Sequence, residues 1–277
     1  MAANVLGRGA DTSAVSTSPP APRPKVNRLV KEPVFVMCSV RSGSTMLRLI
    51  LDSHSQICSP HELHLRTLKV TIKNQYGKLA MSELGLSERR LEYLLWDRVL
   101  HRELSASGKA IIVDKTPSNV FIWERLAEAW PKARYLFLYR HPAAIANSLF
   151  NFTDEETVES AVKRTGEYLE AFAAARDGLA GLSVRYEDLV SDPDRITAEI
   201  CEFIGVPWEP AMVNYGEFDH GKIVKFVGDA SEKLHSGVVQ REVALPAQDE
   251  IPESLREITR RLGYASAGGP EAIEINS

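Results

Sequence analysis

Short apolar runs of strand length alternate along this chain with longer segments in which apolar residues recur at helical spacing. Three of the runs, at 34–39, 110–114 and 134–139, are almost wholly apolar, and each is followed by a loop and a segment of helical length. Strands that are apolar on both faces are typical of a parallel sheet with helices packed on each side. The pattern therefore predicts an α/β fold of three layers, with a central parallel sheet flanked by helices.

The same alternation continues further along the chain. A fourth strand is predicted at 182–186, and a helix at 195–204 should end at Gly205, which can adopt the left-handed conformation of a helix C-terminus. Two more helices are predicted, at 118–130 and from Pro142 onward, where proline suits the first helical turn. All four parallel strands are thus accompanied by a crossover helix.

Domain boundaries follow from where this pattern starts and stops. We predict a disordered tail at 1–29, one α/β domain at 30–265 and a second tail at 266–277. Within the domain, 63–106 is expected to be a helical insertion beside the sheet, and 216–250, which has no periodicity, a mobile loop over the bound ligand. The insertion contains two helical patterns, at 63–76 and 87–105.

Composition and charge exclude several classes of protein. The 277 residues are 44% hydrophobic and 25% charged, and 33 basic against 37 acidic residues give a net charge of −4. This balance excludes a protein that binds nucleic acid through an overall positive charge. No apolar run is long enough to span a membrane, and the three cysteines have no paired spacing. We therefore expect a cytoplasmic protein whose partners include neither nucleic acid nor a membrane.

The strongest local signal is the segment Val40–Thr45, Val-Arg-Ser-Gly-Ser-Thr, between a buried strand and a helix. Unpaired N–H groups at a helix start, with the helix dipole, favour a bound anion, so the segment predicts a P-loop-like fold. The kinase P-loop would need glycine at Cys38 and lysine at Ser44. Because that lysine serves the β- and γ-phosphates, its absence favours an anionic donor without a γ-phosphate, bound with no metal.

Two sequence blocks resemble a known family. Residues 41–48 and 51–54, Arg-Ser-Gly-Ser-Thr-Met-Leu-Arg and Leu-Asp-Ser-His, are similar to the 5′-phosphosulfate loop of sulfotransferases. In motif they are closest to the tyrosylprotein and bacterial branch. The block at 139–148 resembles the family's 3′-phosphate motif, with Arg140 and Ser148 at the corresponding places. The resemblance implies a sulfotransferase domain that uses 3′-phosphoadenosine 5′-phosphosulfate (PAPS) as sulfuryl donor.

The resemblance also implies which residues carry the chemistry. Sulfuryl transfer needs a base for the acceptor hydroxyl and a cation for the charge that grows on the departing phosphate. Glu62 corresponds to the family's general base, with His61 as the rival base, and Lys115 to the lysine that contacts the leaving oxygen. The expected cofactor-binding residues are Arg41, Ser42, Gly43, Ser44, Thr45, Arg140, Ser148, Tyr186, Lys233 and Ser236.

Several alternatives stay open at this point. A divergent P-loop nucleotide kinase would share the strand, loop and helix, and a non-catalytic nucleotide-binding protein could keep the anion cradle without turnover. The acceptor could be a small molecule or carrier-bound: a natural-product alcohol, a hydroxylated acyl chain, a carbohydrate or a tyrosyl peptide. The oligomeric state is open, with a homodimer as one option, and so is a targeting role of the N-terminal tail.

Overall fold

The computed structural model describes residues 27–152, 155–220, 237, 239, 244–264 and 275–276. The sheet in this part of the chain has six strands, in the order β2-β3-β1-β4-β5-β6. The first five strands are parallel, and β6 pairs antiparallel with β5. The strands are β1 (Val34–Cys38), β2 (Ile57–Cys58), β3 (Ile111–Asp114), β4 (Arg134–Tyr139), β5 (Gly181–Arg185) and β6 (Ile275–Asn276).

Helices follow the parallel strands and cover both faces of the sheet. The α-helices are α1 (Ser44–Asp52), α2 (Gln75–Glu83), α3 (Glu88–Ser107), α4 (Trp123–Ala129), α5 (Pro142–Phe150), α6 (Val158–Gly178), α7 (Tyr186–Ser191), α8 (Pro193–Ile204) and α10 (Arg256–Arg261). Single 3₁₀ turns are η1 (Leu65–Thr67), η2 (Pro117–Ile122), η3 (Pro210–Val213), η4 (Tyr215–Glu217), η5 (Gln248–Glu250) and η6 (Glu253–Leu255).

Alternate residues of β1 divide the core into two. Phe35 and Met37 pack with residues of α3, α4, α5 and α6 on one face of the sheet. Val34, Val36 and Cys38 pack with α1, α7 and α8 on the other face. All five side chains are fully buried, because successive side chains of a strand point to opposite faces and each face has its own helical layer. The predicted α/β fold with three layers is confirmed.

The predicted helix at 63–76 is wrong. Only η1 and the first residues of α2 are helical in this stretch, and the chain between them is not. The backbone N–H groups of Val70 and Ile72 donate to the carboxylates of Glu92 and Glu88 on α3 instead of to a helical ladder. These tertiary hydrogen bonds suit a β-branched run, which has low helix propensity. The short strand β2 had no clear sequence signal.

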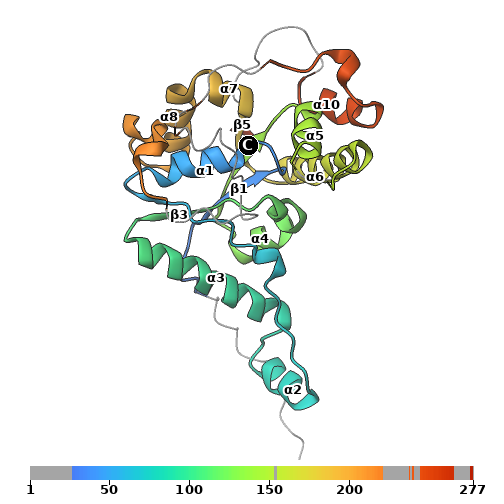
Figure 1. Cartoon of the computed structure of the whole chain (residues 1–277). Helices are drawn as coiled ribbons and strands as arrows, with labels where there is room; N and C mark the ends of the chain where they lie inside the picture. Colours follow the sequence, from blue (N-terminus) through green and yellow to red (C-terminus); the bar gives the residue numbers. More distant parts are fainter. Residues whose placement is uncertain are drawn as a thin grey trace, which may run out of the picture.

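The segment at 63–106 therefore consists of one long helix and an extended arm. Helix α3 packs on the body through Trp96 and Leu100, whereas α2 lies at the far end of the arm, well away from the sheet (Figure 1). No residue of α2 is buried, and Tyr76 and Leu79 are exposed. Among the described helices, none combines the length and apolar composition needed to cross a bilayer.

Candidate functional site

The predicted site residues that the structure describes lie near one edge of the sheet. The segment before α1 follows β1, Lys115 follows β3, Arg140 follows β4, and Tyr186 follows β5. These strands are parallel, so their carboxyl ends lie at the same edge, where open α/β sheets bind ligands. Residues that are far apart in sequence are thereby brought into one site.

The loop between β1 and α1 is held in a conformation that few residues adopt. Arg41 has φ 58° and Gly43 has φ 85°, so two left-handed residues turn the chain sharply into the helix. The hydroxyl of Ser42 donates to the carbonyl of Ser39 at 2.7 Å and braces this turn. The first N–H groups of α1 have no partner within the helix and can bind an anion. The helix begins at Ser44, so strand, loop and helix follow in the predicted order, but Ser44 and Thr45 of the predicted loop belong to the first helical turn.

Tyr186 covers the loop at Gly43. A Cβ atom added to Gly43 would lie 2.2 Å from Cδ2 of the Tyr186 ring, so this position needs glycine both for its φ angle and for its space. On the ring, Cζ of Arg140 lies 4.6 Å from the centroid, at cation–π distance. Loop, ring and guanidinium therefore form one stacked unit.

The two sequence blocks that resemble phosphate motifs contact each other directly. Nη1 of Arg140 donates to the carbonyl of Arg41 at 3.2 Å, and Nε of Arg41 donates to the hydroxyl of Ser148 at 3.2 Å. Nε of Arg140 is buried and has no hydrogen-bond partner among the described residues. A buried guanidinium N–H without an acceptor is costly, so this atom fits a site that is completed by an anionic ligand.

A carboxylate that follows β2 and an ammonium group that follows β3 are in contact. Nζ of Lys115 lies 2.5 Å from Oε1 of Glu62, and their side chains are 1% and 12% exposed. The second oxygen, Oε2, lies 3.4 Å from Nε2 of His64. His61 is exposed, and its Nδ1 faces the main-chain carbonyl of Glu62 at 3.2 Å instead of the carboxylate. Glu62 thus has a buried cation on one side and an imidazole on the other.

A buried hydrogen-bond network supports the Glu62–Lys115 pair. The hydroxyl of Thr116 donates to Asp114 at 2.8 Å and accepts the N–H groups of Leu63 and His64 at 3.1 and 3.4 Å. Asn119 donates to the other oxygen of Asp114 at 2.8 Å. Burial raises the pKa of Asp114, and its hydrogen bonds only partly offset the effect. The network ties the strand that carries Lys115 to the loop that carries Glu62.

His64 was not among the residues that the sequence singled out. Its only signal was an ionisable side chain two positions from the candidate base. Its left-handed backbone, with φ 49°, brings its ring to the Glu62 carboxylate, and such a φ at a histidine is not evident from a sequence pattern. The contact with Glu62 is therefore a product of the tertiary structure.

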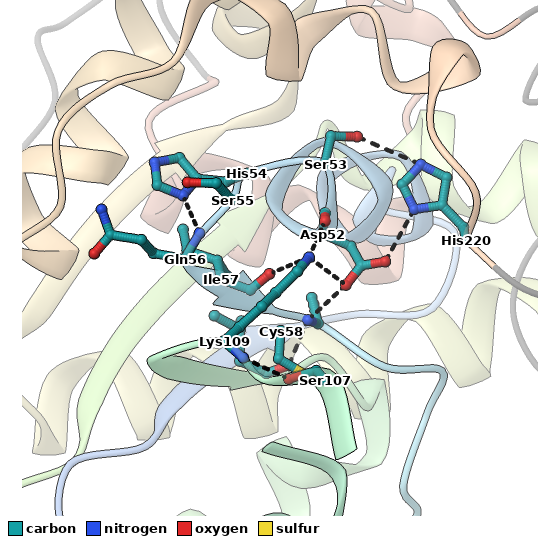
Figure 2. Close-up of polar contacts among 12 residues, drawn as sticks. Asp52, Ser53, His54, Ser55, Gln56, Ile57, Cys58, Ser107, Lys109 and His220 are labelled. Carbon is teal, nitrogen blue, oxygen red and sulfur yellow. Dashed lines mark hydrogen bonds and ion pairs between the residues drawn. The ribbon is translucent and has the colours of Figure 1, made fainter. Parts of the chain in front are cut away.

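The far end of α1 is anchored by a second polar cluster, shown in Figure 2. Asp52 lies 3.0 Å from Nδ1 of His220 and accepts the N–H of Ser59 at 2.9 Å, while Lys109 donates to the carbonyls of Asp52 and Ile57. Burial alone would raise the pKa of Asp52, but these hydrogen bonds and the Lys109 charge outweigh it and lower the pKa. The cluster joins α1 to β2 and to the chain that follows η4.

Two predicted site residues, Lys233 and Ser236, lie outside the described residues, as does most of the predicted loop at 216–250. Within the described residues, 216–220 includes the end of η4 and His220. In the part of the chain that the structure describes, His, Cys, Asp and Glu side chains do not gather in a group that could hold a metal ion.

Comparisons of the sequence with known proteins agree on one class. A family model described as the sulfotransferase family matches residues 33–210. The chain is 25% identical over 266 residues to the nodulation protein NoeE of Sinorhizobium fredii, covering 83% of this chain and 63% of that protein. It is 21% identical over 263 residues to protein-tyrosine sulfotransferase A of Caenorhabditis elegans, covering 86% and 68%. A protein-tyrosine sulfotransferase of Drosophila melanogaster matches at 22% identity over 67% of this chain and 40% of that protein.

Two solved structures share the fold. The sulfotransferase domain from the curacin biosynthetic pathway superimposes with a TM-score of 0.60 at 22% identity, covering 86% of this chain and 99% of that domain. The sulfotransferase domain of the Synechococcus PCC 7002 olefin synthase gives a TM-score of 0.58 at 23% identity, covering 86% and 97%. By contrast, the chain spans only 40% to 68% of the length of the three curated relatives named above.

Proposed function

Because the chain belongs to the sulfotransferase family, we propose that it transfers a sulfuryl group from PAPS to a hydroxyl group of an organic acceptor. The observation that carries the proposal is the convergence at one sheet edge of the loop before α1, the Arg140 guanidinium and the contact between Glu62 and Lys115. An anion cradle alone would suit many nucleotide-binding proteins. A carboxylate in contact with a buried ammonium beside it suits group transfer.

The described residues fit a nucleotide that carries two separate anionic groups. PAPS supplies an activated sulfuryl group on its 5′-phosphate. Arg41 and the first N–H groups of α1, with the hydroxyls of Ser44 and Thr45, would hold that end. Arg140, whose buried Nε lacks an acceptor, and Ser148 would hold the 3′-phosphate, because guanidinium can bind phosphate in a bidentate manner.

Glu62 and Lys115 would then share the chemical step. Glu62 accepts the proton of the acceptor hydroxyl as the oxygen of that hydroxyl forms its bond to sulfur. The bond between sulfur and the bridging phosphate oxygen breaks, and Lys115 stabilises the negative charge left on that oxygen. The products are the sulfated acceptor, 3′-phosphoadenosine 5′-phosphate (PAP) and a proton on Glu62. Both side chains are largely shielded from water, so the electrostatic interactions of their charges are screened less than they would be in water.

The alternatives have less support. A nucleotide kinase would need the P-loop lysine, and Ser44 occupies its position. A non-catalytic nucleotide-binding protein would not need the ion pair between Glu62 and Lys115, nor the buried hydrogen bonds of Thr116 that support it. The acceptor, whether a small molecule or a carrier-bound group, is the part of the function that family membership does not specify.

The proposal is tested by incubating the protein with PAPS and a panel of alcohols, including phenols, sugars, hydroxy acids and tyrosyl peptides. We expect release of PAP and a product heavier by one SO₃ unit, measured by mass spectrometry. Calorimetry with PAP measures donor-site binding independently of any acceptor, and ATP with Mg²⁺ serves as the control nucleotide. Absence of PAP binding, or tighter binding of Mg²⁺-ATP than of PAP, would contradict the proposal.

A further inference from the structure

An aromatic surface with a cation at its edge lies close to the Glu62–Lys115 pair. It consists of Arg66, Phe121 and Tyr168, from η1, η2 and α6, and we call it the Arg66 shelf. Cζ of Arg66 lies 4.7 Å from the centroid of the Phe121 ring, and that ring meets Tyr168 edge-on, with centroids 4.8 Å apart. Arg66 is exposed and Phe121 is 36% exposed, so the surface is accessible to a ligand.

The backbone places the Arg66 shelf beside the reacting groups. Turn η1 begins three residues after Glu62, and the intervening N–H groups are tied to Thr116, the neighbour of Lys115. Turn η2, which carries Phe121, follows Thr116 directly. Arg66 is four residues from Glu62, so their Cα atoms are at most about 14 Å apart.

Electrostatics agree with this placement. Burial raises the pKa of Tyr168, the charges of Arg164 and Arg66 lower it, and the Glu62 carboxylate raises it again. The Tyr168 hydroxyl is therefore within electrostatic range of both Arg66 and Glu62. The Arg66 shelf and the candidate base belong to one neighbourhood.

The positive charge of Arg66 is not neutralised within the described part of the chain. No carboxylate there lies within ion-pair distance of its guanidinium, whereas nearby Arg164 lies 3.6 Å from Glu156. Other exposed arginines, such as Arg195, Arg256 and Arg260, pair with an acid three residues before them in the sequence. A guanidinium over an aromatic ring keeps the N–H groups at its own edges free to bind a carboxylate or phosphate.

We propose that the Arg66 shelf binds the acceptor, and that the acceptor is an alcohol that also carries an anionic group. The anion would pair with Arg66, the apolar part would lie on Phe121, and the hydroxyl would reach Glu62. The inference rests on the proposed function for the role of that hydroxyl. A neutral alcohol would gain only the contact with Phe121 and would leave the guanidinium unpaired.

The test uses two probes that differ in one group, 8-hydroxyoctanoate and 1,8-octanediol. Their binding to the full chain is measured by ligand-observed NMR, with and without saturating PAP, which keeps the carboxylate probe out of the donor site. We expect the hydroxy acid to bind the wild-type protein about tenfold more tightly than the diol, because only it pairs with a charged donor. Arg66→Ala should abolish that difference, and Phe121→Ala should weaken both probes.

Lys132→Ala is the matched control, since it removes one exposed positive charge from the turn before β4, at the opposite edge of the sheet. This variant should keep the preference for the hydroxy acid. Equal binding of both probes by wild type, no detectable binding of the hydroxy acid, or a preference that persists in Arg66→Ala would each overturn the inference. PAP affinity is measured for the same proteins. Absence of PAP binding by the wild type would refute the proposed donor site, whereas a failed probe preference with normal PAP binding would refute only the role of the Arg66 shelf.

Discussion

Nζ of Lys115 lies 2.5 Å from Oε1 of Glu62, although 53 positions separate the two residues in the sequence. The contact joins the end of β3 to the loop after β2, and these adjacent strands are parallel. An ion pair this well shielded from water is costly to form unless it is well supported. Thr116 and Asp114 provide that support, which indicates that the geometry of the pair is built into the fold.

Glu62→Gln should abolish turnover while PAP affinity stays near that of wild type. The amide cannot accept the hydroxyl proton, and loss of a general base costs about 10²- to 10⁴-fold in rate. Its carbonyl oxygen can still accept a hydrogen bond from Lys115, so the fold should persist. The measurements are PAP release and PAP calorimetry, with Glu83→Gln on exposed α2 as control. Full activity of Glu62→Gln would show that the base lies elsewhere, with His61 as the first alternative.

The two neighbouring histidines should behave differently. His61→Ala should retain turnover, because its ring is exposed and faces a carbonyl. His64→Ala removes the imidazole 3.4 Å from the Glu62 carboxylate, so it should lower turnover, measured as PAP release, while PAP affinity stays near that of wild type. If His61→Ala abolished turnover and His64→Ala left it unchanged, the assignment of Glu62 as base would be wrong.

Gly43→Ala should destabilise the protein and weaken PAP binding. The new Cβ would lie 2.2 Å from the Tyr186 ring, and a left-handed alanine costs roughly 1–2 kcal/mol by itself. In a double-mutant cycle with Tyr186→Ala, the free energy of unfolding should show that the two substitutions are not additive, since removing the ring relieves the clash. Strict additivity in urea titrations would mean that the ring does not restrict this position.

Arg140→Ala should weaken PAP binding by about tenfold to a hundredfold, the range for losing a charged hydrogen-bonding partner. Arg140→Lys should recover little of this, because an ammonium cannot replace the bidentate fork or its stacking on Tyr186. Arg98→Ala, at an exposed position on α3, removes the same charge as a control. Calorimetry that found unchanged affinity for Arg140→Ala would exclude this arginine from the phosphate site.

Folding stability should fall between pH 6.5 and about pH 4 because of His141. Burial, with a smaller contribution from the Arg140 charge, lowers the pKa of His141 from 6.5 to about 4. Below pH 6.5 the unfolded chain binds a proton that the folded protein does not, so the free energy of unfolding decreases, by about 1–3 kcal/mol at the lower limit. The stabilisation is thus present above pH 6.5 and lost as the pH falls through this window.

Urea denaturation of wild type and His141→Phe at several pH values tests this. The phenyl ring keeps the edge-on contact with Tyr264 and cannot titrate. The variant should lose less stability than wild type between pH 7 and about pH 4. Parallel curves for the two proteins would assign the acid sensitivity to other groups.

The sequence pattern was sufficient for the architecture. Strands with apolar residues on both faces predicted the parallel sheet, and Pro142 and Gly205 marked the start of one helix and the end of another where the structure has them. These features are local, since they depend on side-chain periodicity and on the backbone preferences of glycine and proline. The resemblance of the two sequence blocks to phosphate motifs predicted the donor-site residues, and their roles stay a prediction.

Only the tertiary structure decided the contacts between these segments. The stretch at 63–76 forms no continuous helix because carboxylates of α3 bind its backbone, and no local propensity encodes such partners. The same holds for the contacts of Glu62 with Lys115 and His64, and for the contact of Arg66 with Phe121. Whether these residues come close in space depends on the order and register of the strands. Periodicity determines which residues face the core, whereas long-range packing determines which polar side chains meet.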